Sequence, residues 1–211
     1  MTEVSTREQM IAAAEQLAAE RGLGAMSLRS VQDASGQRNK SAAHYHFGSR
    51  EGLIDAVVAA RMGPVNERRL EMLAALDARP ASPTLRDLAT VLVVPLAEHT
   101  VALSGSHWAR FLAQGLVDPT LSSLVRRNFE GRSYRDVRAR IVAALDHVPP
   151  ARRARRTDQA VGLVVLTLAT TEAQLTTGSA RIPLAELVTD LIDICAAVLA
   201  APAAAAVTTH P

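Results

Sequence analysis

Hydrogen-bonding and basic side chains gather between Ser27 and Arg50, where they could recognise another molecule. This segment has four basic side chains against the single acid Asp33, although the whole chain carries a net charge of only +2. Arginine and lysine donate hydrogen bonds to guanine and to phosphate, whereas glutamine and asparagine pair with adenine. The chemistry of this segment therefore suits contacts with a nucleic acid. The candidate residues are Ser27, Arg29, Gln37, Arg38, Asn39, Lys40, Ser41, Ala42, His44, Tyr45, His46 and Arg50.

Separate roles follow from the chemistry of the central side chains. Arg38 and Lys40 can donate to guanine O6 and N7 or to phosphate. Gln37 and Asn39 can pair with adenine, and Ser41 can serve either strand. Base-specific contacts are therefore expected from residues 37–41.

The flanking candidates have simpler roles. Ala42 offers a methyl-sized surface that suits the methyl group of thymine. Arg50 could touch the DNA backbone, and Ser27 and Arg29 are further candidates for phosphate contacts. Phe47 is expected in the core, where it would anchor the helix that carries the DNA-contacting residues to its neighbours.

Capping residues place the first part of this region on short helices. Ser5 and Glu8 form a capping box for a first helix, which Gly22 ends. Ser27 can cap a second helix, which stops at Ser35–Gly36. Two helices therefore precede a turn.

A third short helix is expected from its cap at Asn39 to Tyr45, and a fourth starts at Ser49. Two short helices joined by a glycine turn, with the second one basic, are the layout of a helix-turn-helix, whose second helix fits the major groove of DNA. Many small helical proteins also contain two short helices joined at a glycine. The spacing alone therefore leaves a purely structural interpretation open.

Two runs of residues resemble the N-terminal signature of the tetracycline-repressor (TetR) family. The first, 27–36, reads SLRSVQDASG, and the second, 45–53, reads YHFGSREGL. The resemblance covers about a quarter of the chain. It implies an all-α fold, with an N-terminal three-helix helix-turn-helix DNA-binding domain and a C-terminal helical domain for ligand binding and dimerisation. It also implies phosphate contacts from His44, Tyr45 and His46, although both histidines could be plain surface residues.

The spacing departs from the family pattern at one place. One residue more than usual lies between Gly36 and Phe47, so we expect a longer turn. Which of Gln37, Arg38 and Asn39 enters the groove is left open by this insertion. Counting back from Phe47 nevertheless aligns Asn39 with the capping serine of the family.

The rest of the chain is expected to be helical, because aromatic residues make up only 3% of it and strand-like alternation is absent. Gly63–Pro64 is expected to break the fourth helix, and Pro95 to kink a later one. The expected helices are 64–77, 83–99, 105–116, 119–145, 151–177 and 183–200. The expected division is a DNA-binding domain 1–48, a ligand-binding and dimerisation domain 49–200, and a mobile tail 201–211.

Aromatic and polar side chains in the middle of the chain could line a small-molecule site, which needs a mostly apolar cavity with a few polar groups. Aromatic residues at helical spacing can equally be core residues. The candidates for this site are Pro95, His99, His107, Trp108, Phe111, Gln114 and Phe129.

Helices 151–177 and 183–200 carry apolar residues on more than one face, which is more than a single core can cover. The simplest partner for the excess is the same pair of helices from a second copy, which would give a homodimer with a four-helix interface.

Other features bear on location and chemistry. The segment 1–9 lacks the apolar stretch of a signal peptide, and the longest apolar run, 160–169, is too short to span a bilayer. We therefore expect a cytoplasmic protein without membrane contact. Cys195 is the only cysteine, which excludes an internal disulfide and favours a buried apolar role. No cofactor or metal is expected.

These observations predict a dimeric repressor that binds a palindromic operator and is released by an unidentified small-molecule effector. A helical adaptor or a ligand sensor that does not bind DNA is the alternative, and an activator is also compatible with the sequence. An enzyme is not expected, because Glu98, His99, His107 and Arg110 match no spacing of a metal site or a catalytic triad.

Overall fold

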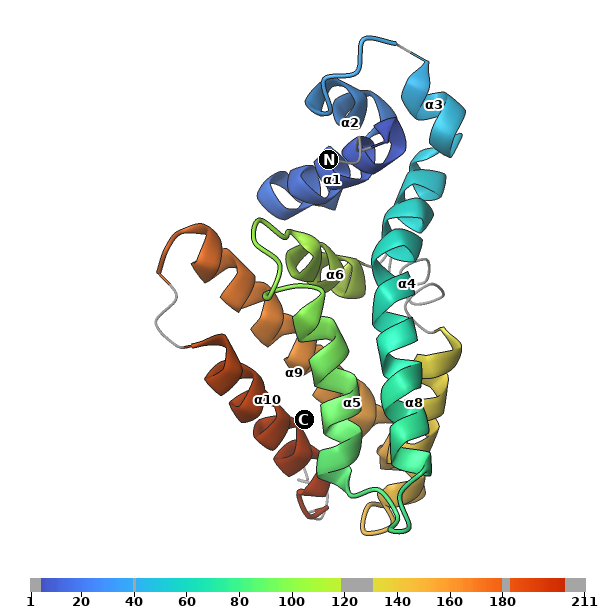
Figure 1. Cartoon of the computed structure of the whole chain (residues 1–211), viewed down its shortest axis with the longest axis vertical. Helices are drawn as coiled ribbons and strands as arrows, with labels where there is room; N and C mark the ends of the chain where they lie inside the picture. Colours follow the sequence, from blue (N-terminus) through green and yellow to red (C-terminus); the bar gives the residue numbers. More distant parts are fainter. Residues whose placement is uncertain (1–4, 40, 119–130, 180–182, 204–211) are drawn as a thin grey trace, which may run out of the picture.

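The computed structural model describes residues 5–39, 41–118, 131–179 and 183–203, and the regular elements of these ranges are all helical (Figure 1). The expected all-α fold is therefore confirmed. The elements are α1 (Thr6–Arg21), the short 3₁₀ helix η1 (Leu23–Ala25), α2 (Leu28–Ala34), α3 (Ala42–Phe47), α4 (Arg50–Asp77), α5 (Leu85–Glu98), α6 (Trp108–Val117), α8 (Arg132–Ala144), α9 (Pro150–Thr176) and α10 (Leu184–Ala200).

The helices form two unequal parts that share one long helix. In Figure 1, α1, α2 and α3 form a small group at one end of the molecule, and α4 runs from this group along the length of the larger part. The larger part contains α5, α8, α9 and α10, while α6 lies between it and α1. A movement of the larger part can therefore reach the smaller part through α4 or through α6.

The expected caps organise the smaller part. The Ser5 hydroxyl accepts a hydrogen bond from the Glu8 amide at 3.2 Å, and Ser27 forms a capping box with Ser30. The Ser49 hydroxyl accepts from the Gly52 amide at 3.1 Å and so starts α4. Each cap satisfies backbone donors that the first turn of a helix leaves without partners.

The expected break at Gly63–Pro64 was wrong, because α4 continues through it from Arg50 to Asp77. Proline removes one backbone hydrogen bond from a helix interior. Met62 and Val65 on either side of it are buried, however, and so is Leu73 further along. Burial of this apolar face stabilises the helix by more than the loss of one backbone hydrogen bond at Pro64 destabilises it.

Three other boundaries differ from the expected ones. The cap of α5 is Thr84, which forms a capping box with Asp87, so the helix begins after Ser82–Pro83 rather than at it. The segment 99–107 forms turns with Gly105 at φ +74°, which delays α6 until Trp108. A single helix over 119–145 was also wrong, since α8 begins after Gly131; residues 119–130 lie outside the described ranges.

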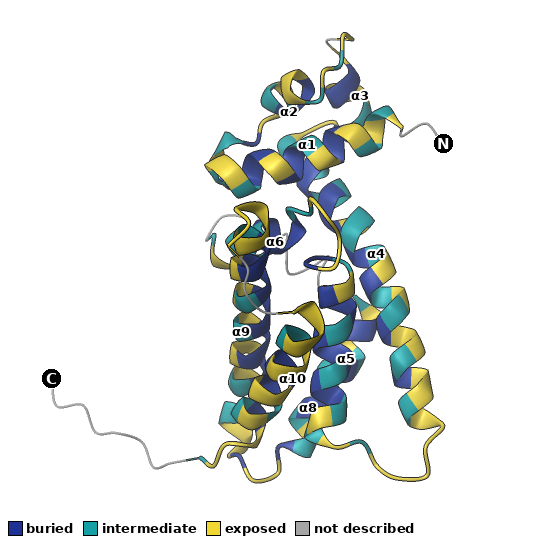
Figure 2. Ribbon diagram, turned by 60° about the vertical axis from the view of Figure 1, so that its left-hand side comes forward, coloured by how far each residue is buried: buried dark blue, intermediate teal, exposed yellow. Residues whose placement is uncertain are grey.

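The helices of the larger part bury one face each, as the colours of Figure 2 show. Trp108 and Phe111 are buried and stack with their ring centres 5.4 Å apart. Cys195 is buried as expected, and burial raises the pKa of its thiol to about 11. Within the described ranges, none of the helices combines the length and the apolar character needed to cross a membrane.

Candidate nucleic-acid interface

The position of α3 depends on one buried polar side chain and a group of apolar ones. Oε1 of Gln32, a buried residue of α2, accepts a hydrogen bond from the Ala43 amide at 3.3 Å. Ala42, Ala43 and Phe47 are buried, which confirms the core role expected for Phe47. Sequence reasoning missed Gln32, because nothing in its local pattern distinguishes it from a solvent-facing glutamine. These contacts leave the opposite side of α3 exposed.

The turn before α3 is longer than expected, and α3 starts later. The Asn39 side chain accepts from the Ser41 amide at 3.0 Å, which closes a local turn instead of capping a helix at that position. The helix starts at Ala42, so Gln37, Arg38 and Asn39 belong to the turn. The insertion after Gly36 is taken up here.

Ala42 is corrected by the structure. It is 6% exposed and packs in the core at the start of α3, so its methyl group does not face a thymine. The packing of two consecutive alanines brings the backbone of α3 close to its neighbours and fixes which side of the helix is covered.

The open side of α3 carries exposed aromatic and polar side chains. Tyr45 is 84% exposed, an unusual position for a large ring, and it contacts the half-buried His46 edge to face. Lys40 lies outside the described residues. The other exposed candidates of this region are Arg29, Arg38, Asn39, Ser41 and His44.

Three candidates have partners inside the protein. The Gln37 amide donates to Gln9 of α1 at 2.7 Å, and the Ser27 hydroxyl takes part in the cap of α2. The Arg50 guanidinium donates to the carbonyl oxygens of Met26 and Leu23 at 2.8 and 2.7 Å. Arg50 therefore joins the start of α4 to the segment before α2, which differs from the DNA contact expected for it.

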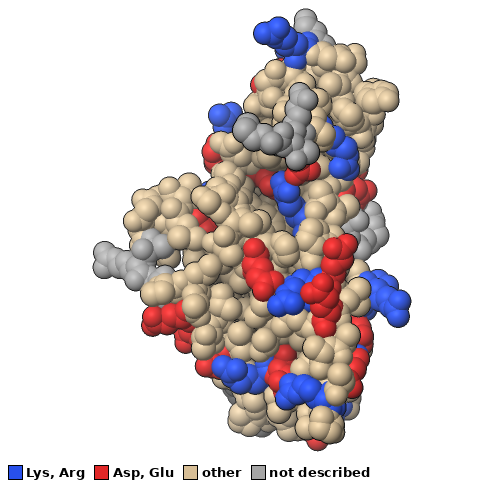
Figure 3. Space-filling view, in the orientation of Figure 1, with Lys and Arg blue, Asp and Glu red and all other residues tan. Residues whose placement is uncertain are grey.

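Charge is distributed unevenly over the molecule. On the face drawn in Figure 3, basic side chains lie at the tip that carries α2 and α3, whereas basic and acidic side chains alternate over the larger part. Many of those in the larger part are paired, such as Arg140 with Asp77 and Arg138 with Asp158. A basic tip of this kind is suited to a polyanion.

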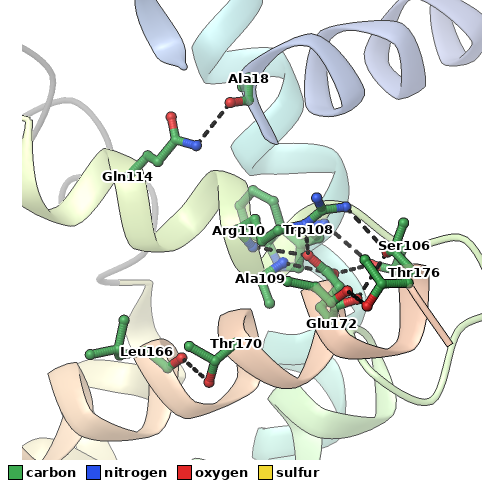
Figure 4. Close-up of polar contacts among 12 residues, drawn as sticks. Ala18, Ser106, Trp108, Ala109, Arg110, Gln114, Leu166, Thr170, Glu172 and Thr176 are labelled. Carbon is green, nitrogen blue, oxygen red and sulfur yellow. Dashed lines mark hydrogen bonds and ion pairs between the residues drawn. The ribbon is translucent and has the colours of Figure 1, made fainter. Parts of the chain in front are cut away.

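Polar contacts of two side chains join the smaller part to the larger one. Gln114 of α6 donates from Nε2 to the Ala18 carbonyl at 2.8 Å and accepts from the Leu23 amide at 3.1 Å; Figure 4 shows the first of these bonds. Arg61 of α4 forms ion pairs with Glu8 and Glu15 of α1. Gln114 therefore holds the end of α1, which corrects its expected place in a ligand pocket.

The opposite end of α6 is held by Glu172 of α9. Its buried carboxylate accepts hydrogen bonds from the amides of Ala109 and Arg110 at 3.1 and 3.0 Å and from the Ser106 hydroxyl at 2.8 Å (Figure 4). The Arg110 side chain adds an ion pair at 3.3 Å. A carboxylate at this end of a helix is favoured by the helix dipole and by the free amides of the first turn.

The residues expected around a ligand site do not line one cavity. His99, His107 and Trp108 border a pocket of about 220 Å³ between α1, α4 and the segment that precedes α6. Phe111 is a buried core residue, and Pro95 is buried within α5. Phe129 lies outside the described residues. This pocket is smaller than the ~300 to 1,000 Å³ typical of drug-sized ligands.

The polar residues considered for catalysis also have structural partners. Glu98 pairs with Arg68, and Arg110 pairs with Glu172. In the ranges that the structure describes, histidine, cysteine and acidic side chains form no group of three or more able to hold a metal ion.

Comparisons with known proteins agree on one kind of protein. Residues 10–57 match the family described as bacterial regulatory proteins of the tetR family, and residues 90–198 match the family described as the tetracyclin repressor-like C-terminal domain. No curated protein sequence matches the chain.

Solved structures share the fold at low sequence identity. AmtR of Mycobacterium smegmatis is 18% identical, with a TM-score of 0.54 over 93% of this chain and 95% of that one. A proposed TetR-family transcriptional regulator from a Rhodococcus species is 15% identical, with a TM-score of 0.54 over 92% of this chain and 99% of that one.

Proposed function

The chain belongs to the TetR family of bacterial regulatory proteins and is a DNA-binding transcriptional regulator; from this premise we propose that it is a repressor that binds a palindromic operator as a homodimer. A small-molecule effector would release it. The observation that carries the proposal is the exposed side of α3, where Tyr45 is 84% exposed beside a basic turn. The fixed opposite side of α3 supports its insertion into a major groove.

We assign base and phosphate contacts by position. Arg38 and Asn39 in the turn and Ser41 at the start of α3 are placed to reach base edges or nearby phosphates. The side-chain chemistry of Lys40 assigns it the same role. The phosphate contacts are assigned to Arg29, His44, Tyr45 and His46. Gln37 would have to exchange Gln9 for a base.

The same proposal divides the chain by task. Residues 1–48 read DNA, residues 49–200 bind the effector and dimerise, and the segment from 201 is a tail, of which 204–211 lie outside the described ranges. Because α4 belongs to both parts, a displacement of its C-terminal half would change the position of α3.

The dimer is assigned to α9 and α10. Between Gln159 and Gly178 the only charged side chain is Glu172, which is buried. Over this stretch the outer side of α9 therefore carries no charge, and it exposes Leu166 at 60%. Ile194 on α10 is 41% exposed. A second copy would bury these groups in an isologous interface, which places two reading helices on the two halves of a palindrome.

Selection of binding sequences from a random duplex library, followed by fluorescence anisotropy, tests the proposal. We expect a palindromic consensus and a steep loss of affinity with salt. Arg38→Ala should lower the discrimination between bases if it reads a base, by about 1 to 3 kcal/mol, whereas Tyr45→Phe should weaken all sequences alike. Arg86→Ala, which removes an exposed arginine of α5, is the matched control and should leave affinity unchanged.

Two outcomes would contradict the assignment. Folded protein that binds no duplex at low salt would favour a helical adaptor or a sensor without DNA binding. A base preference altered by Tyr45→Phe and unaffected by Arg38→Ala would mean that the reading surface is oriented differently.

A further inference from the structure

Three charged side chains are buried in the part of the chain that the structure describes, namely Glu15, Arg69 and Glu172. Burial of a charge is costly unless a partner compensates it. Glu15 is paired with Arg61, and Glu172 is paired with Arg110. Among the described residues, no carboxylate pairs with Arg69, although it is 0% exposed. Arg69 therefore differs from the other two.

The Arg69 guanidinium lies between α4 and α8. Its Nη1 donates to Oδ1 of Asn66 at 3.0 Å and to the Ser133 hydroxyl at 3.4 Å. Ser133 donates in turn to Asn66 at 2.8 Å. The guanidinium carbon lies 5.9 Å from the centre of the Tyr134 ring, within the range of a cation–π interaction. These contacts hold the group in place and satisfy one of its three nitrogens.

The other two nitrogens, Nε and Nη2, are buried without a hydrogen-bond partner. Their N–H bonds point in the same direction and form the side of the guanidinium that receives both oxygens of a carboxylate. Burial lowers the pKa of Arg69 to about 10, so the group is still charged at neutral pH. The free part of Arg69 is thus a complete bidentate donor.

We propose that Arg69 anchors a site for a carboxylate effector, whose two oxygens accept hydrogen bonds from Nε and Nη2. The inference rests on the proposed function, because it names the chemical class of the ligand that switches the regulator. A single negative charge neutralises the single buried cation, whereas a phosphate dianion would leave an excess buried charge. A monocarboxylate therefore fits the site best.

The neighbourhood of Arg69 indicates the rest of the ligand. Val65 and Leu73 lie one turn before and one turn after it on α4, and both are buried. Tyr134 and Val137 are buried on the facing helix α8. The body of the ligand should therefore be apolar.

Binding at Arg69 would be coupled to DNA through α4. The guanidinium is enclosed by packing, so a carboxylate has to open the contact between α4 and α8 to reach it. The same α4 begins beside α3 and carries Arg61, which is paired with α1. A ligand that prefers the opened arrangement shifts the population toward it and changes the position of α3.

Thermal denaturation and calorimetric titration with hexanoate, benzoate and phenylacetate test the site, with the corresponding neutral amides at equal ionic strength as controls. At least one carboxylate should raise the melting temperature of the wild-type protein, while its amide should not. Arg69→Met should lower the affinity for that carboxylate at least tenfold. Arg69→Lys keeps the charge without the bidentate geometry, so its affinity for the carboxylate should lie between those of the wild type and Arg69→Met. Arg68→Met removes the adjacent, exposed arginine and should bind like the wild type.

The stability of the ligand-free variant separates a binding role from a structural one. Arg69→Met removes an uncompensated buried charge, so its melting temperature without ligand should equal or exceed that of the wild type. The proposal fails if no carboxylate acts more strongly than its amide, if inorganic phosphate acts instead, or if Arg69→Met still binds as the wild type does.

The two proposals can fail separately. Operator affinity without carboxylate should be the same for Arg69→Met and the wild type, because Arg69 is far along α4 from α3. Carboxylate binding that depends on Arg69 in a protein that binds no DNA would overturn the proposed function and leave this site intact. Operator binding that no carboxylate affects would overturn the carboxylate effector and leave the proposed DNA-binding function intact.

Discussion

Glu15 shows how a single buried carboxylate joins the two parts of the molecule. It lies on α1, is 5% exposed and is paired with Arg61 on α4. Burial raises the pKa of Glu15, while hydrogen bonding and attraction to Arg61 oppose this effect without cancelling it. The folded protein therefore holds a proton on Glu15 more tightly than the unfolded chain, and this group contributes most stability at low pH.

We expect Arg61→Met to destabilise the protein by about 3 kcal/mol at pH 7, because it leaves a buried carboxylate without its partner. Without Arg61 the pKa of Glu15 should rise further. The free energy of unfolding should then fall as the pH rises above the carboxyl's unfolded value of about 4.3, and over a wider range than in the wild type.

Urea denaturation between pH 4.5 and 8 measures both effects. The double variant Glu15→Met, Arg61→Met removes both charges and should lose the added pH dependence. An Arg61→Met protein whose stability is independent of pH would show that Glu15 is not the titrating group.

At the scale of elements, α6 is the connection between α9 and the DNA-binding part. Glu172 of α9 holds its first turn, and Gln114 near its last turn holds α1 and the segment after it. Both contacts use side chains that accept from or donate to backbone groups, so they fix the position of whole helices. A movement of α9 in the proposed dimer can thereby be transmitted to the DNA-binding domain.

Glu172→Gln tests the contact at the first turn of α6. The variant keeps the shape of the side chain but loses its charge, so we expect a loss of about 2 kcal/mol in the free energy of unfolding, within the range for hydrogen bonds to charged groups. Glu186→Gln, at an exposed position of α10, is the matched control and should change stability little. Equal effects of the two substitutions in urea denaturation would mean that the buried carboxylate contributes nothing specific.

At the scale of the whole molecule, a small DNA-binding part made of α1, α2 and α3 is carried by a larger helical part. The net charge of the chain is only +2, so attraction to DNA has to come from the local basic tip rather than from overall charge. Two DNA-binding domains on one palindrome require two copies of the chain held at a fixed spacing. We place that contact on the outer side of α9 from Gln159 onward, where it carries no exposed charge.

Leu166→Glu tests the dimer. It places a charge in the middle of the proposed interface, and we expect sedimentation to show monomers at micromolar concentration together with at least a tenfold loss of affinity for the full palindrome. Leu103→Glu alters another exposed leucine, which is 52% exposed before α6, and should stay dimeric. A Leu166→Glu protein that sediments as a dimer would place the interface elsewhere.

The sequence by itself determined the features that depend on neighbours a few residues apart. The caps at Ser5, Ser27 and Ser49, the end of α1 at Gly22 and the length of α10 were all predicted correctly, because a cap bonds within about one helical turn. The two runs beginning at Ser27 and Tyr45 were enough to identify the family.

The tertiary structure decided which side of each helix is covered and which polar groups meet. The burial of Ala42, the continuation of α4 through Pro64 and the contact of Gln114 with Ala18 all depend on residues brought together from distant parts of the chain. In the sequence, nothing distinguishes Arg69 from the other arginines expected on helices. Only the packing of α8 against α4 buries it and leaves two of its nitrogens without partners, because burial is a property of the assembled helices and not of any one of them.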